Sequence, residues 1–366
     1  MDYYVFDSNY TPLGILSSPT SVDYIEKYNG LGTFEVHIPI DENNIALLQT
    51  DNVILFDKDR GIAGVIADIN STQSADSPEI TLKGNLNEEM LYRRICWGLF
   101  ESTGTPQQII HSMVNANIIS PTDANRKIAD IVLGVDTLDD QDNLVYQNTG
   151  GVVGENIENI ASSNAFGFRL VYNPVEKQSI LQLYKGTDRT INQRIVPPAI
   201  FSSVEYENIL SSKYTLATQD MRNVALVAGE GEGLNRKTVQ VGTATGKARK
   251  EYFVDARDLQ STNSDGMSIT AEEYTAMLTQ RGTEKLSDLR TSQSFDCTIN
   301  TNGNIRYNED YFLGDTVTIR DESLQIQLDA TISEVEHAVT ATGEELYITF
   351  GFGPLTFVKK LKVKGV

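Results

Sequence analysis

Apolar and polar residues alternate with a period of two along most of the chain, which predicts strands that bury one face. In residues 33–40 every second residue is apolar, and Pro39 indicates an edge strand or a strand end. The strictest alternation runs from Leu324 to Ile332. We therefore expect an α+β fold that is mainly β, with strands facing a core on one side and solvent or a partner on the other.

Four segments show the helical spacing of apolar residues instead: residues 41–48, 105–114, 154–166 and 270 to about 290. Asp41 is expected to cap the first helix, because its side chain can accept the free amides of the first turn. Thr105 followed by Pro106 is typical of a helix start, and Thr270 with Glu273 forms a capping box. Residues 168–184, between the second pair of helices, resemble a β-hairpin.

These elements divide the chain into three regions. Residues 1–95 are rich in strands, residues 96–204 mix helices with the hairpin, and residues 205–358 return to strands around a helical insertion at about 261–290. Pro197 and Pro198 mark one expected boundary. Residues 359–366 form a basic C-terminal tail, which is either solvated or docked on an acidic patch of another subunit.

An internal repeat is the most informative feature of the sequence. Residues 51–57 align with residues 315–321, and residues 64–69 then align with residues 330–335, after a turn that is two residues longer in the second copy. Two interpretations are open, because generic hairpin chemistry could produce so short a match. If the chain instead carries two copies of one β-domain, a trimer would present six similar domains in a ring.

The charge balance disfavours several classes of partner. Thirty basic and fifty acidic residues give a net charge of −20, which repels a polyanion, so we predict no specific nucleic-acid binding. No apolar stretch is long enough for a membrane helix, and the acidic N-terminus does not resemble a secretory signal. We expect folding in the cytosol and no membrane insertion by this chain.

Enzyme motifs are missing from the sequence. The three histidines, His37, His111 and His337, form no metal-binding pair, and each is expected to be solvated or packed. Residues 242–248 resemble a phosphate loop, but only three residues separate the glycines and Ala248 stands where a hydroxyl belongs, so they predict a turn. We predict no catalytic residue, no cofactor and no metal.

The two cysteines, Cys96 and Cys297, have no CxxC companion and predict neither a disulfide framework nor a zinc site. Cys96 follows Arg93 and Arg94, which could favour its thiolate, but no histidine nearby could act as a base. We favour a buried, inert Cys96 beside Trp97, the only tryptophan.

A glycine-rich loop, residues 229–233, joins two strand-like segments, residues 223–227 and 237–241. Its two carboxylates, Glu230 and Glu232, would repel phosphate. The loop is either a mobile hairpin tip or a contact loop for a neighbouring chain. Neither interpretation is catalytic.

Five segments in the same order together resemble a known family: residues 30–36, 93–98, 223–233, 254–259 and 313–317. Over about residues 1–353 the chain resembles the tail-hub, or tail-associated, proteins of long-tailed phages and prophages of Gram-positive bacteria. The resemblance marks nine residues as interface or family-signature positions: Gly32, Phe34, Arg94, Asn223, Gly229, Gly231, Gly233, Gly314 and Asp315.

This resemblance implies a trimeric baseplate hub at the virion tail tip, assembled in the host cytoplasm. Residues 1–95 and 205–358 would form two related β-barrel domains of the tube type, and residues 96–204 would form an inserted α/β domain. The implied partners are two further copies of the chain, a distal tail protein or the tail-tube hexamer, the tape-measure protein, and a receptor-binding or lytic module. An acidic channel would let DNA pass without trapping it.

Two alternatives remain open. The first is a hub of the same architecture in a contractile, bacteriocin-like or secretion-type needle, which only a tail sheath or neighbouring genes would distinguish. The second is a tail-associated peptidase or glycosidase, which the missing catalytic motifs disfavour. Some members of the family continue into a lytic or fibre-like module, and none is visible in the 366 residues.

Overall fold

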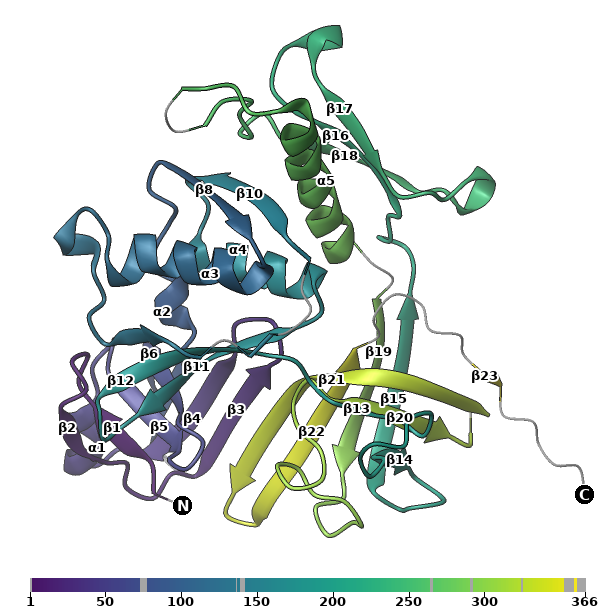
Figure 1. The fold of residues 1–366 in the computed structure, drawn as a ribbon. Coiled ribbons are helices and arrows are strands. Elements are labelled where there is room, and N and C mark those ends of the chain that lie inside the picture. Colours follow the sequence, from purple (N-terminus) through teal and green to yellow (C-terminus); the bar gives the residue numbers. More distant parts are fainter. Residues whose placement is uncertain are drawn as a thin grey trace, which may run out of the picture. The chain divides into compact units, whose positions relative to one another are not determined.

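The computed structural model describes residues 2–72, 78–135, 137–138, 142–263, 266–289, 292–323, 325–351 and 359–360. The chain forms two compact units (Figure 1), and each is assembled from separate stretches of sequence. Unit 1 contains residues 1–89, 167–215 and 294–366, and unit 2 contains residues 90–166 and 216–293. The predicted insertion at 96–204 is thus divided, because its hairpin belongs to unit 1 and its helices belong to unit 2.

Unit 1 is built mainly from strands. Its first part contains β1 (Tyr4–Phe6), β2 (Pro12–Ile15), β3 (Ser21–Lys27), β4 (Thr33–Pro39), α1 (Glu42–Leu47), β5 (Val53–Asp57), β6 (Ile62–Thr72) and β7 (Glu79–Leu86). Its later parts contain β11 (Gly167–Asn173), β12 (Gln178–Tyr184), β13 (Asp188–Arg189), β14 (Ile200–Ser202), β15 (Ile209–Ala217), β19 (Ser292–Ile299), β20 (Thr316–Asp321), β21 (Ile326–Thr340), β22 (Gly343–Gly351) and β23 (Lys359–Lys360).

One large sheet organises unit 1. Its strand order is β15-β19-β22-β21-β3-β4-β7-β6-β5-β1-β2; off this path, β20 and β23 pair with β21, and β13 and β14 pair with β20. Residues alternate between buried and exposed along β3 and β4, as the sequence pattern predicts. Pro39 ends β4, a central strand, so it marks a strand end and not an edge. In the described part of the chain the ladder stays open and closes no barrel, so the two predicted barrels remain a prediction.

The two predicted copies share one strand arrangement. The first copy has the order β5-β6-β7-β4-β3, and the second has the order β20-β21-β22-β19-β15. Each copy has its own apolar core, formed around Phe34 and Phe56 in the first and around Phe295 and Phe350 in the second. The second strand in each order carries a β-bulge, at Ala67 in β6 and at Ser333 in β21, which the predicted alignment places at equivalent positions.

The first strand of the repeat needs a correction of one residue. The Asp51 amide donates to the Ile66 carbonyl at 2.9 Å, and the Gly314 amide donates to the Ile332 carbonyl at the same distance. Asp51 and Gly314 both have positive φ, of 67° and 93°. Asp51 is therefore equivalent to Gly314, and the predicted match of Asp51 with Asp315 is shifted by one position.

Unit 2 combines helices with two small sheets (Figure 1). It begins with α2 (Glu89–Tyr92). The elements that follow are β8 (Leu99–Gly104), α3 (Pro106–Val114), a π-helix (Asn115–Ile119), a 3-10 turn (Ala124–Arg126), β9 (Ile131–Leu133), β10 (Leu144–Thr149), α4 (Val153–Ser163), β16 (Val224–Ala228), a 3-10 turn (Gly233–Asn235), β17 (Thr238–Val241), a 3-10 turn (Gly246–Ala248), β18 (Glu251–Asp255) and α5 (Ala271–Asp288). Helix α5 packs on the sheet β17-β16-β18 and buries Tyr274, Met277 and Leu278.

The predicted helix starts are confirmed. The Asp41 carboxylate accepts the Asn44 amide, and both Thr105 and Thr270 form complete capping boxes with Gln108 and Glu273. Two predicted limits, Arg290 for α5 and Leu324 for the last alternating strand, lie outside the described residues.

Candidate functional site

The nine predicted residues do not form one site. Gly32, Phe34, Gly314 and Asp315 lie in unit 1, and the other five, Arg94, Asn223, Gly229, Gly231 and Gly233, lie in unit 2.

In unit 1, Gly32 and Phe34 are packing positions of the first repeat. A Cβ atom at Gly32 would lie 2.4 Å from the Ile25 carbonyl oxygen, so only glycine fits there. Phe34 is buried and its ring lies 5.0 Å from that of Phe56. Gly32 allows close packing against Ile25, and Phe34 fills the apolar core of the first repeat.

Gly314 and Asp315 directly precede strand β20 of the second repeat. The buried Asp315 carboxylate accepts the Thr187 amide and the Arg189 guanidinium, both at 2.7 Å. Gly314 lies against the Tyr28 ring, where a Cβ atom would come within 2.3 Å. Asp315 thus connects the start of β20 to β13 and the residue before it, and the charges of Asp315 and Arg189 compensate each other.

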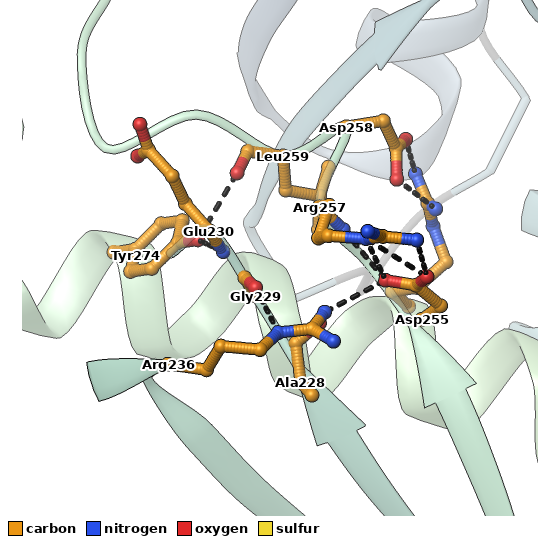
Figure 2. Close-up of polar contacts among 10 residues, drawn as sticks. Ala228, Gly229, Glu230, Arg236, Asp255, Arg257, Asp258, Leu259 and Tyr274 are labelled. Atoms are coloured by element: carbon orange, nitrogen blue, oxygen red, sulfur yellow. Dashed lines mark hydrogen bonds and ion pairs between the residues drawn. The ribbon is translucent and has the colours of Figure 1, made fainter. Parts of the chain in front are cut away.

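In unit 2, the glycine-rich loop meets the 254–259 segment at the ends of the parallel strands β16 and β18 (Figure 2). The Glu230 amide donates to the Tyr274 hydroxyl at 2.7 Å, and that hydroxyl donates to the Leu259 carbonyl at 3.0 Å. A Cβ atom at Gly229 would lie 2.3 Å from the same hydroxyl, which explains this glycine. Gly231 and Gly233 have positive φ, of 104° and 55°.

Arginine and aspartate side chains complete this loop cluster (Figure 2). Arg236 donates to the carbonyls of Ala228 and Gly229 and to the Asp255 carboxylate. Arg257 also binds Asp255, and hydrogen bonds from these two arginines lower the pKa of Asp255 to about 2. Arg281 binds Asp258 through two hydrogen bonds. The cluster pairs its charges internally and holds the loop, and it presents no activated nucleophile.

Asn223 lies at the other end of β16. Its side chain accepts the Lys250 amide and donates to the Ala248 carbonyl, both at 2.8 Å. It ties the segment before β18 to β16, as a turn-forming residue does. Residues 242–248, the predicted turn, contain Gly242 with a φ of 95° and connect β17 to β18.

Arg94 belongs to a surface loop of unit 2. Its guanidinium donates to the carbonyls of Arg126 and Arg93, and burial together with repulsion from these two arginines lowers its pKa. The neighbouring Cys96 is fully buried, and burial raises its thiol pKa to about 11, so this cysteine is not activated.

Unit 1 contains a buried ionic cluster that no sequence pattern indicates. His337 of β21 lies 3.2 Å from Glu26 of β3, and Glu26 accepts two hydrogen bonds from Arg60. Burial disfavours these charges, yet contacts with His337 and Arg60 lower the pKa of Glu26 to about 2. Contacts with Glu26 and Glu344 likewise outweigh burial and raise the pKa of His337. We call these residues, Glu26, Arg60 and His337, the seam cluster, because they join the two repeats.

No group of three or more potential metal ligands occurs within the described ranges. Among the same residues, no helix is both long and apolar enough to cross a membrane.

Comparison with known proteins identifies the fold and the family. A search of curated proteins gave no significant match. Three solved structures are similar over nearly the whole chain. A tail protein of Neisseria meningitidis MC58 has a TM-score of 0.58 at 12% identity, covering 96% of both chains. The 43 kDa tail protein of prophage MuSo2 from Shewanella oneidensis has a TM-score of 0.55 at 11% identity, covering 96% of this chain and 98% of that one.

The prophage tail protein gp18 from Listeria monocytogenes EGD-e has a TM-score of 0.53 at 13% identity, covering 97% of this chain and 96% of that one. At these identities the likeness concerns the fold. The family model of the siphovirus ReqiPepy6 Gp37-like proteins matches residues 2–352. The chain therefore belongs to this siphovirus tail protein family, as its five sequence segments predict.

Proposed function

We propose that this chain is the hub of a phage tail tip, in which three copies form a ring that continues the tail tube as a channel. The proposal rests on one observation in unit 1. Strands β21 and β3 pair where the two repeats meet, and the equivalent strands of the other repeat, β6 and β15, each leave the corresponding edge unpaired among the described residues.

Inside the chain the junction is a strand pair. Residues 334–340 of β21 pair antiparallel with residues 21–27 of β3. In the first repeat, β6 occupies the place of β21, and in the second repeat β15 occupies the place of β3. Among the described residues, 68–72 of β6 pair only with β7, and β15 pairs only with β19. Each chain thus carries one closed junction and the two halves of another.

The unpaired edges expose apolar side chains whose counterparts are buried. Val335 of β21 is fully buried, whereas its equivalent in β6, Ile69, is 36% exposed. Leu216 of β15, the equivalent of the buried Glu26 of β3, is 54% exposed. Pairing β6 of one copy with β15 of the next would cover both side chains, at about 25 cal/mol for each Å² of apolar surface removed from water.

Such a contact joins two different surfaces and is head-to-tail, so repeated use produces either a ring or an open filament. Three chains with two repeats each give six similar repeats, which suits a sixfold tail tube or distal tail protein as the partner. A closed ring also removes the unpaired strand edges, which would otherwise promote aggregation.

The polar face of the sheet is the proposed channel wall. One row across four strands contains Asp68, Lys83, Glu35 and Asp23 at directly paired positions. Glu334, Glu336 and Glu345 continue this face on β21 and β22. An excess of carboxylates on this wall would keep DNA from binding during its passage.

The proposal includes no catalytic activity. The buried Cys96, with its raised pKa, and the internally paired charges of the loop cluster support a structural role. Purified protein should not hydrolyse peptidoglycan or casein, with or without divalent metal ions. Hydrolysis that disappears on substitution of a single Asp, Glu or Cys would show that the chain is an enzyme.

Native mass spectrometry across a range of concentrations tests the ring. We expect trimers in the wild type and a loss of at least about tenfold in association for Ile69→Lys, because the charge would be buried in the contact. Ile195→Lys, at a residue 93% exposed, is the matched control and should still form trimers. Dimers or tetramers as the main species, or unchanged assembly of Ile69→Lys, would contradict the proposal.

A further inference from the structure

A second surface, on unit 2, combines the only tryptophan with arginines that form no ion pair with a carboxylate in the described part of the chain. The Trp97 side chain is 73% exposed, although a tryptophan side chain has a large apolar surface that is usually buried. The Arg126 guanidinium lies 5.2 Å from the centre of its ring. We call Arg94, Trp97 and Arg126 the tryptophan patch.

The backbone under Trp97 is fixed. The Trp97 amide donates to the Asn117 side chain at 3.1 Å, and the Asn117 side chain donates to the Met113 carbonyl at 3.0 Å. The amide and carbonyl of the preceding Cys96 bond to Gly151 and Gly150, at 2.8 and 2.9 Å. The exposed ring therefore stands on a rigid base, and a rigid aromatic anchor binds a partner at low entropic cost.

Asn117 lies in the π-helix of residues 115–119, which directly continues α3. A π-turn is less stable than an α-helical one and occurs often at functional sites. Here it aims the Asn117 side chain at the Trp97 backbone. The local irregularity thus serves to present the tryptophan.

The two arginines of the patch bond to main-chain carbonyls. Arg126 donates to the Ile95 carbonyl at 2.7 Å, and Arg94 donates to the carbonyls of Arg126 and Arg93. Within the described residues, neither forms an ion pair with a carboxylate. The nearest acidic residue in sequence to Arg126 is Asp123, which accepts the Asn125 amide. This is unusual in a chain of net charge −20, where carboxylates are abundant.

From this geometry we infer that the tryptophan patch is a docking site for an acidic segment of another protein. The guanidinium groups keep donors that suit a carboxylate, and the indole ring supplies an apolar surface for a neighbouring aliphatic side chain. A long polyanion such as DNA fits less well, because the charge of −20 repels it beyond the patch. A short acidic segment experiences only the local field, since salt screens charges over about 8 Å. The inference does not depend on the proposed ring.

Tryptophan fluorescence tests it directly, because Trp97 is the only tryptophan. In the wild type, iodide should quench the emission several-fold more efficiently than caesium, since the arginines attract the anion. Arg94→Gln with Arg126→Gln should remove this preference. Arg222→Gln is the matched control, because Arg222 also donates to main-chain carbonyls of unit 2 and should leave the preference unchanged.

The ligand probe is the peptide acetyl-Glu-Leu-Asp-Glu-Leu-Asp-amide, titrated into the full chain. We expect a blue shift of the Trp97 emission and binding about tenfold tighter than that of the peptide with Gln and Asn in place of Glu and Asp. Equal binding of the two peptides, no shift at millimolar peptide, or equal quenching by iodide and caesium would overturn the inference. Tighter binding of a twelve-residue oligothymidine would also overturn it, because the partner would then be a nucleic acid. These comparisons use the wild type and stay decisive if a variant fails to fold.

Discussion

The closed junction between β21 and β3 and the unpaired edges of β6 and β15 occupy equivalent places in the two repeats, yet their side chains differ. The closed junction contains the seam cluster, in which His337 and Arg60 contact the buried Glu26. Counting from the equivalent bulges, the position of His337 corresponds to Ser71 in β6, which is neutral and exposed.

This difference indicates two kinds of contact built from one strand arrangement. Buried charges are tolerated only where their partners are always present, and inside one chain the partners cannot dissociate. A strand edge that is exposed before assembly would hold only some of the charged residues of such a cluster, and burying them without all their partners would be costly. Neutral and modestly apolar residues such as Ser71 and Ile69 suit an edge that is first exposed and then covered.

The largest effect should come from breaking the seam cluster. Glu26→Gln would remove the buried carboxylate that Arg60 and His337 share and leave them only the more exposed Asp57 and Glu344, so we expect a loss of about 3 kcal/mol in the free energy of unfolding. Urea unfolding at pH 6 measures it. Glu176→Gln, in an exposed turn of unit 1, should change the stability by less than about 0.5 kcal/mol, and equal effects of the two substitutions would refute the assigned role of the cluster.

Equivalent alanine substitutions should have unequal effects on folding. Val335→Ala removes a fully buried side chain and should destabilise the chain by about 2 kcal/mol, whereas Ile69→Ala should cost less than about 0.5 kcal/mol in the monomer. Thermal unfolding of dilute protein compares them. Similar losses for the two variants would mean that Ile69 is already buried without a partner chain.

The stability should depend on pH through Glu336, whose counterpart in β6 is the neutral Asn70. Partial burial and, to a smaller extent, repulsion from Asp23 raise the pKa of Glu336 to about 7. Its ionisation therefore weakens the folded state as the pH rises from about 4.5 to 7, and the full penalty persists above that range. Glu336→Gln should stabilise the protein by about 1 kcal/mol at pH 8, after allowance for solvent screening, and not at pH 4. A gain of the same size at both pH values would exclude ionisation as its cause.

The smallest expected effect is that of salt on assembly. Because Ile69, Ser71 and Leu216 are uncharged, and Asp68 and Lys213 lie exposed at opposite ends of the contact, the association constant of the ring should change by less than about twofold between 0.05 and 0.5 M NaCl. Sedimentation velocity at the two salt concentrations measures it. A steep loss of association at high salt would instead point to an ionic interface.

Local chemistry made much of the fold predictable. Thr105 and Thr270 announce their helices because capping depends on residues three positions apart, and strand alternation appears directly in the order of residues. The predicted alignment of the first repeat strand is shifted by one residue. Matching Val53 with Val317 preserves the apolar alternation, whereas neither the bulge after Leu55 nor the positive φ of Asp51 is visible in the order of residues.

Features that depend on distant parts of the chain were not predictable. Glu26 and His337 are more than 300 residues apart, so their contact appears only once β3 and β21 pair. The division of residues 96–204 between two units has the same origin. The predicted signature residues were found to be mostly packing and turn positions, whereas the exposure of Trp97 needed the structure.

The most direct measurement of the central claim is a disulfide across the proposed contact between chains. The Ser211 hydroxyl of β15 bonds to the Thr298 hydroxyl of β19 at 2.8 Å. Thr298 is equivalent to His37 of β4, and His37 pairs with Ser21 of β3, so Ser211 corresponds to Ser21. Because Glu336 pairs with Ile25 inside the chain, Asn70→Cys should then lie opposite Thr215→Cys of the next copy. Strands β6 and β15 are separated by six strands of the same sheet, so the two cysteines cannot meet within one chain.

Mild oxidation of this double variant, followed by intact mass measurement under denaturing conditions, should give covalently closed trimers and nothing larger. Each single variant should remain monomeric under the same conditions. A ladder that continues beyond three chains, a dominant dimer, or no cross-linking at concentrations where wild-type trimers form would contradict the ring.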